Sequence, residues 1–199
     1  MLELAKNTNQ SKENTKVIVN AVKSCYNAGI LVVCSAGNTG ENIHDSVDIK
    51  RYPSYYPETV SVLSIDNNFT PSKFSSHNTM GYVTQFGQNI LVKNSKGEEM
   101  LVSGTSPTTA IVAFTMALHL CKIKASGKSM TVQEQFEFIK NNTIDMNTVG
   151  KDNLTGYGFF TLDKNEFKRV KLMILDADKD GLVQRVNMIR DKVKSGVVS

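Results

Sequence analysis

The sequence predicts an α/β domain built around a mostly parallel sheet. Ile30 to Cys34 form an unbroken apolar run, which is typical of a strand buried on both faces and predicts a central strand. Apolar residues at helical spacing between Lys16 and Ala28 predict a helix before that strand. A long apolar segment after Gly104 predicts a second helix. Strands that alternate with helices favour a parallel sheet.

A further strand, turns and a further helix are predicted from the residues themselves. Val60 to Ile65 alternate in part between apolar and polar side chains, so we expect a half-buried strand there. Gly81, Gly87 and Gly97 are expected to lie in turns between strands. Thr131-Val-Gln-Glu134 has the spacing of a capping box and therefore predicts the start of another helix.

Ser106 follows a turn of small residues, Ser103-Gly-Thr105, at the start of the strongly apolar helix. The first N–H groups of a helix have no partner within the helix and lie at the positive end of its dipole. They can stabilise an oxygen that becomes negative during a reaction, which makes Ser106 a candidate nucleophile. The alternative is an ordinary Ser N-cap with Pro107 at the first helical position, which requires no chemistry.

The predicted central strand runs directly into Ser35-Ala-Gly-Asn38. An Ala-Gly-Asn turn after such a strand, together with Gly-Thr-Ser before a helix, resembles the subtilisin-like serine proteases. Three other segments strengthen the resemblance, which covers roughly residues 15 to 163. They are Tyr52-Pro-Ser-Tyr-Tyr-Pro57 before a strand, Phe74-Ser-Ser76 followed by a strand over Tyr82–Ile90, and Gly156-Tyr-Gly158.

The resemblance implies a three-layer subtilisin-like fold and hydrolysis of a polypeptide substrate by acyl transfer. Ser106 would be the nucleophile. The oxyanion donors would be the side-chain amide of Asn38 and the backbone N–H of Ser106. Pro107 departs from the family, which usually has Met or a similar residue there, and its ring is expected to push Ser106 toward an extended backbone.

The family's Asp and His have no counterpart in this sequence. In that family they precede the oxyanion Asn by a long stretch, whereas only 37 residues precede Asn38 and neither Asp-Ser/Thr-Gly nor His-Gly-Thr-His occurs. None of His44, His77 and His119 is at a family position, and His119 is expected to have a dipole or core role in its helix. Because a Ser hydroxyl without a general base is a poor nucleophile, we expect little hydrolysis by this chain alone.

Two hypotheses account for that gap. In the first, the chain is the carboxy-terminal half of a protease, its amino-terminal strands are missing, and the amino-terminal half of the peptidase domain is its partner. In the second, the chain is a non-catalytic binding or structural module with the same fold.

Composition limits the other classes of function. At 199 residues and 40% hydrophobic, the chain is long enough for one main domain, predicted over 1–164, with a helical tail over 165–199. The net charge of +4 is not concentrated in a basic cluster, which argues against a nucleic-acid partner. The longest apolar run, Ala110 to Cys121, is shorter than the roughly 18 residues of a membrane span, so none is expected.

Three cysteines, Cys25, Cys34 and Cys121, are predicted to be free core thiols on a helix, the central strand and a buried helix. Free thiols in an odd number favour an intracellular compartment, whereas the family resemblance favours secretion. The compartment therefore stays open.

The predicted tail contains an acidic loop from Asp176 to Asn187. Asp176, Asp178 and Asp180 occupy alternate positions before Gly181, which resembles an EF-hand calcium loop. Asn187 replaces the bidentate Glu at the twelfth position, which lowers the expected calcium affinity. A turn linking two helices is the alternative. If the loop binds calcium, a third hypothesis is a calcium-dependent interaction domain.

Overall fold

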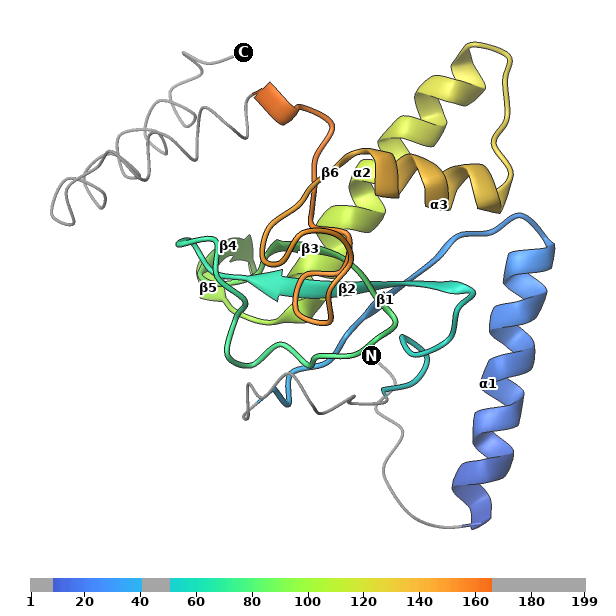
Figure 1. Cartoon of the computed structure of the whole chain (residues 1–199), viewed down its shortest axis with the longest axis horizontal. Helices are drawn as coiled ribbons and strands as arrows, with labels where there is room; N and C mark the ends of the chain where they lie inside the picture. The colour runs from blue at the N-terminus through green and yellow to red at the C-terminus, as the bar shows by residue number, and fades with distance from the viewer. Residues whose placement is uncertain (1–8, 41–50, 166–199) are drawn as a thin grey trace, which may run out of the picture. The chain divides into compact units, whose positions relative to one another are not determined.

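The computed structural model describes residues 9–40 and 51–165. Two long helices, one shorter helix and seven strands make up this part of the chain (Figure 1). In chain order they are α1 (Asn9–Asn27), β1 (Val32–Ser35), β2 (Thr59–Ile65), β3 (Gly81–Phe86), β4 (Ile90–Lys93), β5 (Glu99–Val102), α2 (Thr105–Ala125), α3 (Val132–Asn141), β6 (Thr143–Ile144) and β7 (Phe159–Phe160). The predicted α/β class is confirmed.

The main sheet has the strand order β1-β2-β3-β7-β6. The pairs β1–β2, β2–β3 and β3–β7 are parallel, and the short β6 is antiparallel to β7. Strands β4 and β5 form a separate antiparallel hairpin, in which Gly97 has a φ of 81° and occupies the predicted turn. Gly87 lies between β3 and β4 as expected, whereas Gly81 is the first residue of β3 and not a turn residue. The carboxyl end of β1 leads into the Ala-Gly-Asn turn, so the sheet itself positions Asn38.

The prediction that Ile30 to Cys34 form a central strand is not confirmed within the described residues. There, β1 pairs with β2 alone and lies at the end of the strand order. Ile30 precedes β1 and is 55% exposed. An apolar run indicates that both faces of a strand are buried, but it does not show whether both edges of the strand are paired.

The expectation of a half-buried strand at β2 is wrong, because all seven of its residues are buried. The serines that suggested a solvent-facing side lie inside the protein. The hydroxyl of Ser64 contacts the hydroxyl of Ser72 at 2.8 Å, and the backbone N–H of Ser64 donates to Ser75 Oγ at 3.1 Å. A small hydroxyl group such as that of Ser64 can be buried when it finds a hydrogen-bond partner, whereas the Ser61 hydroxyl is buried without one.

Helix α2 packs one side against strands β1, β2 and β3. Val112 and Met116 are buried on that side, four residues apart and therefore on one face. With residues of the sheet and α3 they form the hydrophobic core, which consists of Val60, Val62, Val83, Val112, Met116, Ile139 and Phe160. This packing fixes the start of α2, and hence Gly-Thr-Ser, beside the carboxyl end of β1.

A different side of α2 is exposed. We call it the uncovered stripe: Ala110, Phe114, Ala117, Leu118 and Cys121 recur at helical spacing and all are exposed. Phe114 is 65% exposed and Leu118 48%. The prediction that Cys121 lies in a buried helix is therefore wrong.

Helix α2 is longer than the apolar run on which the expectation of no membrane span was based. By length and composition, this helix of 21 residues is the one in the described residues that could cross a membrane. A core helix passes the same test, and α2 packs on the sheet.

The capping box is confirmed at the start of α3. Thr131 Oγ1 accepts from the N–H of Glu134 at 3.2 Å, and the Glu134 carboxylate accepts from the N–H of Thr131 at 2.6 Å. These hydrogen bonds from Thr131 lower the pKa of the Glu134 carboxyl. His119 on α2 stacks on Phe138 of α3 with ring centroids 3.7 Å apart, which supports the packing role expected for it.

All three cysteines are free thiols, as predicted. Cys25 is half-buried on α1, and Cys34 is buried on β1. Burial raises the pKa of the Cys34 thiol to about 11, although a hydrogen bond with Thr59 acts in the opposite direction. Cys34 is therefore a core side chain and not a reactive thiol.

The chain divides into two compact units, one ending at Phe160 and one beginning at Thr161. Of the second unit, the structure describes residues 161–165. There, Thr161 Oγ1 accepts from the N–H of Asp163 at 3.1 Å. The predicted calcium ligands Asp176, Asp178 and Asp180 lie outside the described residues, so both the calcium loop and the boundary after residue 164 stay predictions.

Candidate active site

The side chain of Asn38 is joined to the start of α2. Its Oδ1 atom accepts a hydrogen bond from the backbone N–H of Thr105 at 2.8 Å and another from Thr105 Oγ1 at 2.9 Å. These two bonds fix the orientation of the amide, because only the oxygen can accept them. Nδ2 is therefore the atom left to donate, and Asn38 is exposed.

Thr105 is the residue that holds the two segments together, and sequence reasoning missed it. The side chain is fully buried between the turn after β1 and the helix. Its hydroxyl contacts Ser35 Oγ at 2.5 Å and accepts from the N–H of Gly37 at 3.2 Å, besides donating to Asn38. In the sequence, only the position of Thr105 between Gly104 and the predicted nucleophile indicated a role in the site.

Gly104 is the N-cap of α2 and has a φ of 156°. Its N–H donates to the carbonyl of Gly87 at 2.8 Å, which connects the turn to the end of β3. A Cβ at Gly104 would lie 3.4 Å from Asn38 Nδ2. Glycine thus satisfies the backbone conformation and leaves the space that adjoins the Asn38 amide open.

Ser106 is exposed and lies in the first turn of α2. The alternative that Ser106 is an N-cap is wrong, because Gly104 is the N-cap and Thr105 is already helical. The expected extended backbone at Ser106 is also wrong, since the helix includes both Ser106 and Pro107. Proline fits in the first turn because it removes an N–H that has no partner within the helix.

The two described histidines lie on α2 and in a loop before β3. His119 lies 13 residues beyond Ser106 on the same helix, about 20 Å along its axis. His77 is buried in the loop before β3, and His44 lies outside the described residues. The part of the chain that the structure describes also holds no group of three His, Cys, Asp or Glu side chains placed to bind a metal ion.

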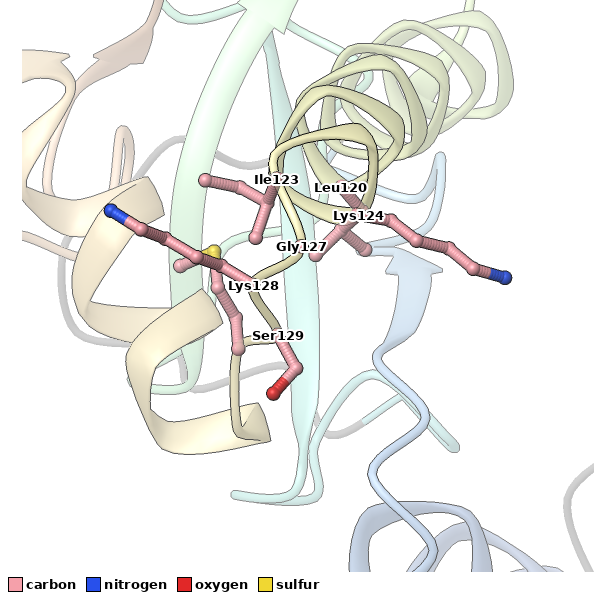
Figure 2. Close-up of a pocket in the computed structure, with 7 residues that line it drawn as sticks. Leu120, Ile123, Lys124, Gly127, Lys128 and Ser129 are labelled. Carbon is pink, nitrogen blue, oxygen red and sulfur yellow. The ribbon is translucent and has the colours of Figure 1, made fainter.

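A cavity of about 500 Å³ lies at the other end of α2 (Figure 2). Its walls include Leu120, Ile123 and Met130, with the side chains of Lys124 and Lys128 at its margin. The nearest of these residues is 14 positions beyond Ser106, or about 21 Å along the helix. The cavity is therefore separate from the candidate site.

Comparison with known proteins agrees with this geometry. A model of the subtilase family of peptidases matches residues 4–158, more than half of the chain. The chain belongs to the subtilase family. The matched residues of this subtilase include Asn38, Thr105 and Ser106.

Curated relatives of this subtilase are serine proteases. The chain is 31% identical to the intracellular serine protease of Paenibacillus polymyxa over 150 residues, which are 75% of this chain and 46% of that protein. It is 28% identical to the minor extracellular protease Epr of Bacillus subtilis, covering 73% of this chain and 21% of that one. The chain thus spans less than half the length of these relatives, which include both intracellular and extracellular proteases.

Solved structures show the same fold. A lanthipeptide protease matches with a TM-score of 0.68 and 22% identity, covering 83% of this chain and 57% of that one. The prenylagaramide maturation protease PagA matches with a TM-score of 0.64 and 20% identity, covering 81% and 56%. These neighbours confirm a subtilisin-like fold.

Replacing Thr105 with Val is expected to destabilise this subtilase by about 1–3 kcal/mol. The change keeps the shape of the side chain but removes the buried hydroxyl that bonds to Ser35 Oγ, the N–H of Gly37 and Asn38 Oδ1, and it leaves the Gly37 N–H with only its longer bond of 3.3 Å to Ser35 Oγ. Urea unfolding monitored by circular dichroism measures the loss. Thr109→Val is the matched control, because the Thr109 hydroxyl bonds only back to the Thr105 carbonyl one turn earlier. Equal effects of the two changes would contradict the anchoring role of Thr105.

Proposed function

We propose that this subtilase chain supplies the nucleophile and the oxyanion donors of a serine endopeptidase. The observation that carries the proposal is the pair of hydrogen bonds from Thr105 to Asn38 Oδ1. They hold the Asn38 amide at the start of the helix that presents Ser106, with Nδ2 left as the donor. A side-chain amide donor at the start of a helix whose first turn presents an exposed serine supplies two parts of the acyl-transfer machinery, the oxyanion donor and the nucleophile.

In the proposed reaction, Ser106 Oγ attacks the carbonyl carbon of a peptide bond while a histidine takes its proton. The carbonyl oxygen becomes negative and accepts hydrogen bonds from Asn38 Nδ2 and the N–H of Ser106. The C–N bond then breaks, and the same histidine gives its proton to the leaving amine. Water then attacks the resulting ester while the histidine takes a proton from it. The histidine gives that proton to Ser106 Oγ as the ester bond breaks, which releases the acid and restores the Ser106 hydroxyl.

The Asp and His come, in this proposal, from a segment that corresponds to the amino-terminal part of the relatives. The match covers 46% of one relative and 21% of the other, so more than half of each relative lies outside it. We call this chain, together with a segment that carries the Asp-Ser/Thr-Gly and His-Gly-Thr-His motifs, the completed enzyme.

Two exposed surfaces support the pairing with such a segment. The uncovered stripe on α2 leaves Phe114 and Leu118 exposed side by side on one helical face. Strand β1 pairs on one edge only, within the described residues, and an unpaired strand edge accepts a further strand. A segment that adds strands beside β1 and covers α2 would bury both surfaces.

Replacing Phe114 with Asp is expected to weaken binding of the amino-terminal segment at least tenfold. The change places a charge where an aromatic side chain would be buried, and it does not touch the packed face of α2. Isothermal titration of the segment into the chain measures the loss. Val149→Asp is the control, because Val149 is fully exposed in a loop. Unchanged affinity for Phe114→Asp would show that the stripe is not the contact surface.

The function is tested by sequencing the coding region upstream of Met1 and then assaying the completed enzyme. In-frame Asp-Ser/Thr-Gly and His-Gly-Thr-His motifs, followed by hydrolysis of a casein substrate, are the expected result. If the upstream region lacks both motifs and no added segment restores hydrolysis, the chain is a non-catalytic module with a subtilase fold.

A further inference from the structure

Arg51 lies against the turn that holds Asn38. Its Nη2 atom donates a hydrogen bond of 2.6 Å to Thr39 Oγ1, in the residue that follows Asn38. On the other side of Asn38, a Cβ at Gly37 would lie 3.3 Å from Arg51 Cγ. The arginine side chain therefore bonds to the residue immediately after the proposed oxyanion donor and lies close to the residue immediately before it.

Both ends of this contact are held in place. The carbonyl of Arg51 accepts from the N–H of Tyr55 at 2.7 Å and from Ser54 Oγ at 2.9 Å, which fixes the backbone that carries the side chain. Thr39 is fixed by Ser76, whose Oγ accepts from the N–H of Thr39 at 3.1 Å. The guanidinium is thus positioned before any ligand binds, which lowers the entropic cost of using it.

The charge of Arg51 is not neutralised within the described residues. The ion pair found there joins Lys140 to Glu137 on α3, and no described carboxylate approaches Arg51. Its side chain is half-buried, and one of the five N–H donors of the guanidinium is used by Thr39. The remaining donors form a planar fork that matches both oxygens of a carboxylate.

We propose that Arg51 binds a carboxylate of the substrate, so that the enzyme prefers peptides with an Asp or Glu side chain close to the bond that is cleaved. The inference rests on the proposed function, because Asn38 marks where the scissile carbonyl lies only if it is an oxyanion donor. A peptide whose carbonyl reaches Asn38 brings its neighbouring side chains next to the Thr39–Arg51 contact. Arg51 is then a specificity-determining residue.

The test measures peptide binding separately from hydrolysis. Fluorescein-labelled peptides with a single Glu, moved along an otherwise uncharged sequence, are compared with matched peptides that carry Gln. Binding to the full chain with Ser106→Ala is followed by fluorescence anisotropy. For at least one Glu position we expect binding roughly tenfold tighter than for its Gln partner, with the difference decreasing as salt is added.

Arg51→Gln is expected to remove this preference, since glutamine keeps an N–H donor for Thr39 but has no charge. Arg51→Lys should retain only part of it, because the charge remains and the fork is lost. Lys122→Gln is the matched control: it removes one exposed positive charge about 25 Å along α2 from its start. Equal binding of Glu and Gln peptides at every position, or a preference that survives Arg51→Gln, would overturn the inference.

The same peptides, given to the completed enzyme with Ser106 intact, separate this inference from the proposed function. Cleavage without any preference for nearby acidic residues would overturn the role of Arg51 and leave the peptidase intact. Acid-dependent binding without any cleavage would instead support the role of Arg51 as a carboxylate site and contradict the peptidase.

Discussion

Ser106→Ala in the completed enzyme is expected to lower kcat for peptide hydrolysis by on the order of 10⁶-fold, the loss known for removal of the nucleophile in subtilisin itself. The Ser106 hydroxyl is the atom that forms the acyl-enzyme bond in the proposed reaction, and alanine has no atom to replace it. Folding is expected to be unaffected because Ser106 is exposed in the first turn of α2. Single-turnover hydrolysis of a fluorogenic peptide, with circular dichroism as a check of folding, measures both quantities.

Ser103→Ala is the matched control for this change. Ser103 is exposed, lies three residues before Ser106 and accepts a hydrogen bond from the N–H of Asn89 at 3.0 Å. Its loss is expected to leave kcat within about twofold, because surface substitutions have small effects. Turnover retained in Ser106→Ala, or lost equally in Ser103→Ala, would rule out Ser106 as the nucleophile.

Asn38→Asp is expected to lower kcat by about 10²–10³-fold while KM changes little. An oxyanion donor acts on charge that develops in the transition state, so its loss affects kcat rather than ground-state binding. Aspartate keeps an oxygen that can accept from Thr105, as Asn38 Oδ1 does, but it replaces Nδ2 with a second oxygen. Steady-state kinetics on a neutral peptide separate the two parameters.

Asn38→Ala distinguishes the two roles of the side chain. It removes both the donor and the acceptor, and so it should lower kcat to a similar extent. It should also destabilise the fold by about 1–3 kcal/mol, since the N–H of the buried Thr105 loses its partner. If Asn38→Asp were fully active and only Asn38→Ala impaired, Asn38 would be an anchor for Thr105 and not an oxyanion donor.

The sequence predicted well those features that depend on local pattern. Three predicted elements lie close to their predicted positions: a strand at the apolar run Ile30 to Cys34, the apolar helix after Gly104 and the helix that begins with the capping box at Thr131. The sequence-based prediction of which residues are buried was wrong where burial depends on partners that are distant in the sequence. Ser64 of β2 is inside the protein, where it bonds to Ser72 and Ser75, and the stripe through Phe114 is exposed although its composition resembles a core.

The sequence predicted the two reactive residues of the candidate site but not the residue whose hydrogen bonds connect them. Ser106 and Asn38 were both chosen from short motifs, 68 positions apart in the sequence. Thr105, which joins them, was not predicted, because its anchoring role depends on hydrogen bonds to Ser35, Gly37 and Asn38 that only the fold brings together. Arg51 was missed for the same reason: its position beside Thr39 follows from the fold and not from the spacing in the sequence.

The central claim, that Ser106 is an activated nucleophile, is tested most directly by covalent labelling. The completed enzyme is treated with diisopropyl fluorophosphate, which phosphorylates activated serines, and the modified residue is located by peptide mass spectrometry. The account predicts one phosphorylated serine, Ser106, with labelling strongly reduced in Asn38→Asp and in the chain without its amino-terminal segment. Absence of labelling in an enzyme that hydrolyses peptides, or labelling of a different serine, would contradict it.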